Sequence, residues 1–366
     1  MDERYIGLVK ETIRELSDIM NVSIKDQFKD AIKSAMGRSV RAKDPMFWPA
    51  GMLMLGLVEA RKKISDEVSA KDGALEDELG GLINSIDKAI ADHLALWNDK
   101  YGSRIDYIDD ALSGAALIKL YCQLRSEGKS EGNLASSCEQ AANRIYGYLS
   151  AAPRDQVGSI VYNASRSSNV FADGAGQTSM FLILYGNTFG DDNAVELGQL
   201  QLLNFMKYGC DKKSSLPYHG YALTVGEGED ARLTVEKKGL LSWSRAAGWI
   251  IMGLSQVRAV PELKSWYDNL SKVLLTYQMP EGGFAWQIQA TEGHIDTSAT
   301  GMIVYGVGSS DGRPADISDT IAALWQNIRD DRVINSLSSC DDFGVHYQNY
   351  GHFPWGQGAV LAAISK

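Results

Sequence analysis

The 366-residue chain lacks several patterns that mark common classes of protein. Its four cysteines form no Cys-x-x-Cys pair and stand far apart, at Cys122, Cys138, Cys210 and Cys340. Disulfide-stapled and zinc-binding domains space their cysteines closely, so we expect reduced thiols in a cytoplasmic protein. No apolar run reaches the about 18 residues that a membrane span needs, and the charged start Met1-Asp2-Glu3-Arg4 lacks the apolar core of a signal peptide. We therefore expect no membrane partner.

Positive charge and cofactor motifs are also scarce. Lys and Arg number 36 against 46 Asp and Glu, a formal net charge of -10, so we expect no nucleic-acid partner. The chain has no His-Glu-x-x-His, no Cys/His cluster at zinc spacing and no Gly-x-Ser-x-Gly. Gly174-Ala-Gly176 and Gly356-Gln-Gly358 follow no predicted strand, so neither indicates a dinucleotide site. We expect neither a metal nor an organic cofactor.

What the sequence does contain is an internal repeat. Six apolar segments rich in Gly, Ala, Ser and Thr each follow a polar or aromatic start, and successive starts are 54 to 70 residues apart. The starts lie near Trp48, Asp109, Asp173, Trp243, Thr297 and Trp355. Because these segments lack a polar face, we expect six helices that are buried on all sides.

Six amphipathic segments alternate with the apolar ones. Apolar residues three and four positions apart, with charges between them, are typical of a helix with one solvated face. These segments cover residues 5–20, 79–97, 134–149, 193–208, 262–278 and 317–328. We predict an all-α fold, a single (α/α)6 barrel over residues 1–366, in which six outer helices surround six closely packed inner helices. An open helical solenoid is the alternative, but the first and last repeats carry no evident polar cap.

The longest connections lead into the predicted inner helices. They cover residues 98–108, 158–172, 209–241, 279–296 and 338–354, and they gather Tyr, Trp, His, Asp and Gly. Long ordered loops are usually functional, and this composition suits a polar ligand held against aromatic surfaces. Helix N-termini that meet at this end favour an anionic ligand.

Two aspartates, Asp109 and Asp173, each open an inner helix at this end. Two carboxylates at the mouth of one cavity can act as a catalytic acid and base. Asp is also a preferred N-cap residue, so helix capping is the alternative for each of them. Asp110, the neighbour of Asp109, can take either role.

Candidate substrate-binding residues gather in the same loops and helix starts. Arg245 stands among aromatic residues and needs an anion or carboxylate partner. A histidine in a loop, such as His219, is more often a turn residue, and a tryptophan is a core residue by default or stacks on a sugar ring. His352 stands at the sixth position around the mouth. The candidates are His219, Arg245, Trp243, Trp48, Trp249, Tyr218, His352 and Trp355.

Eight short motifs occur in a characteristic order. They are Trp48-Pro-x-Gly51, Asp109 to Gly114, Phe171-Ala-Asp173, Tyr218-His-Gly-Tyr221, Trp243-x-Arg-x-x-Gly-Trp249, Gly282-Gly-Phe-x-Trp286-Gln287, Thr297-Ser-Ala-Thr300 and Trp355-Gly-Gln-Gly358. This order resembles the unsaturated glucuronyl and rhamnogalacturonyl hydrolases, glycoside hydrolase families 88 and 105, the second more closely. The resemblance runs from about Pro45 to the C-terminus.

The resemblance implies an (α/α)6 barrel that acts on oligosaccharides ending in a 4,5-unsaturated uronic acid, which polysaccharide lyases produce. Such enzymes hydrate the double bond: a proton goes to C4, water adds at C5, and the resulting hemiketal collapses to release the neighbouring sugar. The aspartate matching Asp173 is the family's proton donor and water activator, and the one matching Asp109 assists. His219 and Arg245 match residues that bind the unsaturated sugar, with Trp243 beside it.

The chain departs from these families at a few positions. Ala247 and Ala222 stand where the families commonly carry polar residues, and Gly174-Ala-Gly-Gln177 replaces a bulkier apolar run. Two other functions therefore stay open: a carbohydrate-active barrel with different hydrolase or lyase chemistry, and a sugar-binding barrel without turnover. In each case we expect a carbohydrate ligand, an oligosaccharide substrate on the first interpretation, and a monomer or homodimer.

Overall fold

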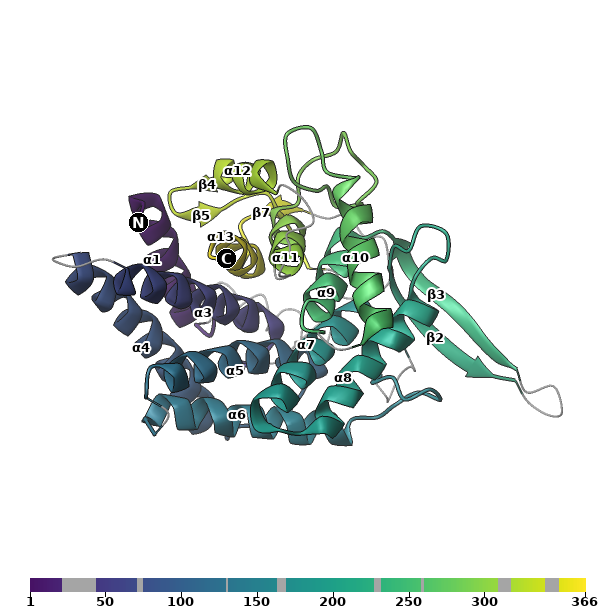
Figure 1. Ribbon diagram of the computed structural model, residues 1–366, viewed down its shortest axis with the longest axis horizontal. Helices are drawn as coiled ribbons and strands as arrows, with labels where there is room; N and C mark the ends of the chain where they lie inside the picture. The colour runs from purple at the N-terminus through teal and green to yellow at the C-terminus, as the bar shows by residue number, and fades with distance from the viewer. Residues whose placement is uncertain are drawn as a thin grey trace, which may run out of the picture.

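The computed structural model describes residues 1–21, 44–70, 75–129, 131–162, 169–226, 232–257, 260–308, 317–339 and 349–366. Within these ranges, twelve long helices alternate along the chain between an inner and an outer ring (Figure 1). Both rings fall where the two types of sequence segment predict them.

The inner ring is built from the six small-residue segments. Every residue of the fourth and fifth inner helices is buried. Each inner helix contacts the next, and the last packs against the first, so the ring is closed and the open solenoid is excluded. The inner helices are α3 (Trp48–Ser69), α5 (Ala111–Ser126), α7 (Ala172–Phe189), α9 (Ser244–Leu254), α11 (Thr297–Val307) and α13 (Pro354–Ile364).

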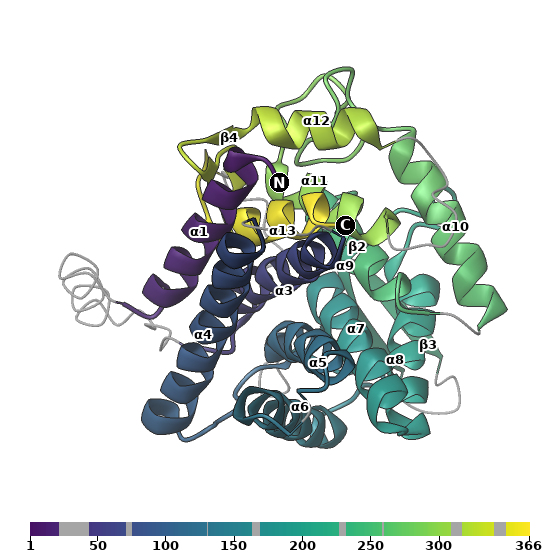
Figure 2. The ribbon, with the colours of Figure 1, turned by 60° about the vertical axis from the view of Figure 1, so that its left-hand side comes forward.

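The outer helices surround this ring, as Figure 2 shows. The first of them begins at an N-cap, where the Asp2 carboxylate accepts a hydrogen bond from the Arg4 amide (3.1 Å). It buries Leu8, Val9 and Leu16 at helical spacing and leaves its other face in solvent. The outer helices are α1 (Glu3–Asp18), α4 (Leu75–Tyr101), α6 (Asn133–Ala151), α8 (Asp192–Asn204), α10 (Pro261–Leu275) and α12 (Ser318–Gln326).

Glycines let neighbouring inner helices approach backbone to backbone. A Cβ at Gly176 of α7 would collide with the main-chain carbonyl of Trp249 on α9. A Cβ at Gly358 of α13 would meet the carbonyl of Met52 on α3, at the point where the ring closes. The small residues of the repeat are therefore a requirement of inner-ring packing.

The prediction of a loop over residues 209–241 is wrong in part. It contains a hairpin of β2 (Tyr218–Val225) and β3 (Leu233–Leu241), which extends away from the helices in Figure 1. With β1 (Asn169–Phe171) it forms an antiparallel sheet in the order β1-β2-β3. Alternating apolar residues at 223, 225, 233 and 235 were the period-two signal of these strands. Between these strands, Gly226-Glu-Gly228-Glu-Asp230 has the composition of a solvated turn, and its residues 227–230 lie outside the described ranges.

Two small β-pairs lie near the C-terminal end of the chain. They are β4 (Ile328–Arg329) with β5 (Arg332–Val333), and β6 (Ser336–Leu337) with β7 (Tyr350–Gly351). The second pair holds the segment that leads into α13.

The two ends of the chain lie side by side (Figure 1), where the Tyr5 hydroxyl and Ser365 Oγ are hydrogen-bonded at 2.7 Å. Cys122, Cys138 and Cys210 are free thiols, and Cys340 lies outside the described residues. Among the helices that the structure describes, none is long and apolar enough to cross a membrane.

Candidate active site

A cavity of about 220 Å³ opens at the end of the barrel where the inner helices begin. It brings together both predicted carboxylates and five of the predicted binding residues. Its walls come from the starts of α3, α7, α9 and α13 and from the segments that lead into the inner helices. The lining residues are Phe47, Trp48, Pro49, Asp109, Tyr162, Phe171, Asp173, His219, Trp243, Arg245, Ser339 and Trp355.

Asp109 lies just before α5, in a 3-10 turn over Ile108–Asp110, and it is almost fully buried. The Tyr162 hydroxyl donates to its Oδ2 at 2.7 Å, and Gln177 Nε2 donates to its Oδ1 at 3.3 Å. No side-chain capping bond is found at the start of α5. The carboxylate is thus held by two donors at the cavity wall, and the capping alternative does not apply.

Asp173 lies in the first turn of α7 and keeps 25% of its side-chain surface exposed. The N-cap of this helix is Phe171, which makes no capping bond through its side chain. Among the described residues, Asp173 Oδ2 has no hydrogen-bond partner, and His219 Nε2 is 3.6 Å away. Asp173 therefore lines the cavity and does not cap the helix.

His219 owes its position to an irregularity in β2. The register between β2 and β3 shifts between Tyr218 and Gly220, and such bulges redirect a side chain. The imidazole packs between the rings of Phe171 (5.2 Å) and Trp243 (4.3 Å), measured between ring centroids. The ring is nearly buried and aimed at Asp173.

Arg245, in the first turn of α9, is buried but not unpaired. Its guanidinium donates to the carbonyls of Leu337 (3.0 Å) and Ser338 (2.8 Å), and it lies 3.9 Å from the carboxylate of Asp296. It also lies over the Trp243 ring, 4.9 Å from the centroid. The expected carboxylate partner is thus Asp296, and the arginine also fixes the segment before the cavity residue Ser339.

Aromatic rings form another part of the cavity wall. Trp48 and Trp355 lie 5.0 Å apart, and Phe353 stacks on the outer side of Trp355 at 4.7 Å. Trp355 Nε1 donates to the Leu337 carbonyl at 2.9 Å, which fixes its ring. Rings held in this way offer a rigid apolar surface to a sugar.

Two predicted binding residues, Trp249 and Tyr218, lie outside the cavity. Trp249 is buried within α9, more than a turn below the mouth, and contacts Trp48 edge to face at 6.0 Å. Tyr218 is adjacent to His219 in a strand, where successive side chains point to opposite faces. Its ring lies near Lys237 Nζ instead, 5.7 Å from the centroid.

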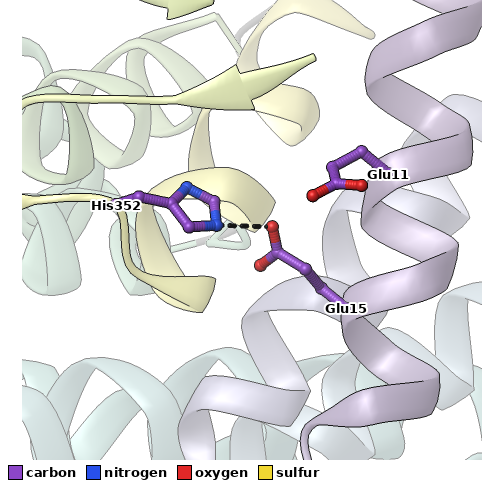
Figure 3. A group of neighbouring side chains, drawn as sticks. All are labelled: Glu11, Glu15 and His352. Carbon is purple, nitrogen blue, oxygen red and sulfur yellow. Dashed lines mark ion pairs between the residues drawn. The ribbon is translucent and has the colours of Figure 1, made fainter. Parts of the chain in front are cut away.

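The third residue outside the cavity is His352, which binds the first outer helix (Figure 3). Its Nε2 lies 2.7 Å from Glu15 Oε1, and its Nδ1 lies 2.9 Å from the Val333 carbonyl. Glu11, one turn earlier on α1, completes the one cluster in the described part of the chain where three possible ligand atoms lie within 4.8 Å. Arg14 and Arg332 both donate to Glu11, so its charge is already balanced. His352 thus links α1 to the segment before α13.

The cavity also contains residues that the sequence did not single out: Phe47, Pro49, Tyr162, Phe171 and Ser339. Phe47, Pro49 and Phe171 adjoin or lie within quoted motifs, so their neighbours were the signal. Tyr162 and Ser339 belong to predicted long loops but to no motif. The departures Ala247 and Ala222 are buried and do not line the cavity.

Asp110 has a structural position beside Asp109. Its Oδ2 accepts hydrogen bonds from the amides of Asp106 (3.2 Å) and Tyr107 (3.4 Å), and it does not line the cavity. Burial, the nearby charge of Asp44 and that of Asp109 raise the pKa of Asp110 well above its usual range. Of the two predicted roles, catalysis and helix capping, the contacts of Asp110 with backbone amides before the helix correspond to capping.

A sequence model of Glycosyl Hydrolase Family 88 matches residues 18–364. Comparison with curated protein sequences finds no match.

Solved structures of similar fold come from several bacteria. A possible family 105 member from Salmonella enterica serovar Paratyphi A is 14% identical with a TM-score of 0.70, and the alignment covers 98% of this chain and 92% of that one. A possible family 105 member from Klebsiella pneumoniae is 15% identical with a TM-score of 0.71, over 100% and 93%. An unsaturated glucuronyl hydrolase from a Bacillus species, responsible for glycosaminoglycan degradation, is 14% identical with a TM-score of 0.66, over 98% and 96%.

Proposed function

Because the chain belongs to Glycosyl Hydrolase Family 88 and is a glycoside hydrolase, we propose that it removes a terminal 4,5-unsaturated uronic acid from oligosaccharides by hydrating the C4=C5 bond. The family match confirms the resemblance drawn from the eight sequence motifs. The proposal adds the substrate class, the mechanism and the roles of individual residues.

The observation that carries the proposal is the unequal environment of two carboxyl groups in one cavity. Asp109 accepts two side-chain hydrogen bonds, whereas Asp173 Oδ2 has no hydrogen-bond partner within the described ranges. Different surroundings favour different protonation states, as an acid and a base require. We assign the acid role to Asp173 and the role of the charge-stabilising carboxylate to Asp109.

The proposed reaction has three stages: protonation of C4, addition of water at C5 and release of the neighbouring sugar. The Asp173 carboxyl donates its proton to C4, and the electron pair of the C4=C5 bond forms the new C4–H bond. Positive charge develops at C5 and the ring oxygen, and the negative charge of Asp109 stabilises it. Water adds at C5 and returns a proton to Asp173. The hemiketal then opens: the C5 hydroxyl loses its proton as the bond between C5 and the ring oxygen breaks, and the ring oxygen takes up a proton. C1 now bears this hydroxyl and the glycosidic oxygen, and this hemiacetal collapses to an aldehyde and releases the neighbouring sugar.

Binding is assigned to the rest of the cavity wall. The rings of Trp48 and Trp355 supply a stacking surface for sugar, and His219 is placed to hydrogen-bond a substrate group beside Asp173. Arg245 and the inner-helix N-termini supply positive potential for the substrate carboxylate.

The test is the ultraviolet absorbance of the conjugated unsaturated uronate, followed after the protein is added to a panel of lyase-generated disaccharides. We expect the absorbance to fall with at least one of them. In D₂O, the product should carry one deuterium at C4, because the proton comes from an exchangeable carboxyl group. Release of the sugar with the double bond intact would contradict hydration and favour direct glycosidic hydrolysis. Binding without turnover across the panel would favour a silent sugar-binding barrel.

A further inference from the structure

Two residues outside the quoted catalytic motifs donate hydrogen bonds to Asp109. Tyr162 follows the third outer helix in the chain, and its hydroxyl reaches Asp109 Oδ2 at 2.7 Å. Its ring packs edge to face on Phe171, with 5.0 Å between centroids, which holds the hydroxyl in place. The donor and its orientation therefore come from the same wall of the cavity that carries Asp173.

Gln177 approaches the other oxygen of Asp109. It lies on α7 one turn after Asp173, so both side chains project from the same face of that helix. Its Nε2 lies 3.3 Å from Asp109 Oδ1, and its side chain is almost completely buried. Within the described residues, Gln177 Oε1 has no hydrogen-bond partner. The hydrogen bond from Nε2 to Asp109 is therefore the side-chain contact that compensates for the burial of this amide.

We propose that Tyr162 and Gln177 are positioning residues that hold Asp109 as an oriented, ionised carboxylate during the reaction. The inference rests on the proposed function for its catalytic consequence, but the hydrogen bonds themselves can be tested without substrate. Two neutral donors stabilise the charged form of a carboxylate more than the protonated form. Loss of either donor therefore favours the protonated form of Asp109.

The other charged groups around Asp109 make such donors necessary. Asp173 shares its cavity, and Asp110 lies beside it in the chain and couples to it electrostatically. Both favour protonation of Asp109 when they are themselves ionised. On the positive side, His219 and Arg245 line the same cavity, but Arg245 already donates to the carbonyls of residues 337 and 338. Tyr148, on α6, is also near: burial and the charges of Asp110, Asp106 and Asp109 raise the pKa of its hydroxyl.

The first experiment measures the pH dependence of kcat for Tyr162→Phe and Gln177→Met. Each variant removes a donor and leaves most of the side-chain volume in place. We expect kcat to fall about 10- to 100-fold with KM little changed, and the acid limb of the profile to move up by about one pH unit. An unchanged acid limb in both variants would overturn the proposal.

Tyr267→Phe is the matched control, because it also deletes one buried hydroxyl. That hydroxyl donates to the carbonyls of Gly306 and Val307 at the far end of α11. The control should lose stability but keep the wild-type pH profile. An equal shift in the control would show that any loosening of the barrel moves the profile, which contradicts a specific role for Tyr162.

The second experiment uses thermal unfolding and no substrate. Tyr162→Phe should lower Tm at neutral pH by about 1–3 °C, and this loss should be smaller in an Asp109→Asn background, where the acceptor is a neutral amide oxygen. Persistence of the full loss in the Asp109→Asn background would overturn the proposal. If this coupling is found but no disaccharide is turned over, the proposed function fails while the positioning of Asp109 stands.

Discussion

The two ends of the barrel differ in how fully their buried polar groups are paired. Away from the cavity, near the end of α11, Glu59 accepts hydrogen bonds from Lys119 (2.9 Å) and Tyr305 (2.7 Å). At the amino ends, Asp173 Oδ2 and Trp243 Nε1 have no hydrogen-bond partner in the described part of the chain. Buried polar groups without partners are costly, and these two belong to residues that line the cavity, where a ligand can complete them.

The far end also contains a fully buried arginine. Arg61 Nε donates to Asp87 at 2.6 Å, and its terminal nitrogens bind Glu127 at 2.6 and 2.9 Å. These bonds join α3 to the outer helix α4 and to the end of α5. The comparison shows that buried charges are paired at both ends, and that the cavity end also keeps one carboxyl oxygen, Asp173 Oδ2, without a hydrogen-bond partner among the described residues.

The largest effect should come from Asp173→Asn at the cavity end. The change removes the acid with almost no change of shape, so turnover should fall by at least about 10³-fold while the folded structure remains. The measurement is the rate of absorbance loss, with circular dichroism as a check of folding. Asp92→Asn, the same change at an exposed site on α4, should leave the rate unaltered. Substantial activity in Asp173→Asn would remove this residue from the acid role.

At the opposite end, Arg61→Met should destabilise the fold without altering the chemistry. It leaves Asp87 and Glu127 without their partner, and breaking such a pair costs about 3–5 kcal/mol in unfolding free energy. Urea unfolding gives this loss, and kcat per folded molecule should stay within about twofold of wild type. A fall in kcat beyond that would break the separation between the two ends.

The Arg61–Glu127 pair should also make the unfolding free energy depend on pH in the acid range. The hydrogen bond from Arg61 holds the pKa of Glu127 at about 2, well below its usual 4.5. Since the folded pKa is lowered, Glu127 contributes stability above about pH 4.5, and this contribution is lost as the pH falls towards 2. The unfolding free energy should therefore drop over this range in wild type and drop less in Arg61→Met. Parallel curves would contradict the role of this pair.

A smaller catalytic effect is expected from Arg245→Lys. The lysine keeps the charge but cannot donate to both the Leu337 and Ser338 carbonyls in the planar geometry of arginine. We expect kcat/KM to fall about 10-fold, mainly through KM, which steady-state kinetics will show. Arg104→Lys, at an exposed ion pair, should behave as wild type. A selective loss in kcat would mean that Arg245 acts on the transition state instead.

The smallest effect concerns His352. Burial lowers the pKa of its imidazole, but the hydrogen bond and charge of Glu15 outweigh this and raise the pKa above 6.5. Because the folded pKa is raised, the pair contributes stability below pH 6.5 that is lost as the pH rises through the folded value. His352→Gln should cost about 0.5–1.5 kcal/mol at pH 6 and less at pH 9, measured by urea unfolding. An equal cost at both pH values would show that the charge contributes nothing.

The sequence predicted the helices better than the neighbourhood of the cavity. Small-residue and amphipathic segments differ over ten or more residues, so both rings and their order could be read from composition and periodicity. The direction of a single side chain is set more locally. Tyr218 and His219 are neighbours, yet the strand geometry and the register shift between Tyr218 and Gly220 send only His219 to the cavity.

Long-range partners were the other gap in the prediction. His352 stands at the predicted mouth, but its charge partner Glu15 comes from the opposite end of the chain. Tyr162 has no motif around it, and its role is visible only once α5 and α7 meet across the cavity. Neither pairing leaves a periodic signal, because the contact depends on closure of the ring.

Closure of the ring by α3 and α13 has a consequence for synthesis on the ribosome. The two helices pack against each other, yet almost the whole chain separates them, so α3 leaves the exit tunnel long before its neighbour is translated. Until then, the face of α3 that carries Met52 and Gly56 has no partner. The ring can therefore close only after α13 has been synthesised, and until then the folding chain is an open arc with an apolar edge, a form prone to aggregation.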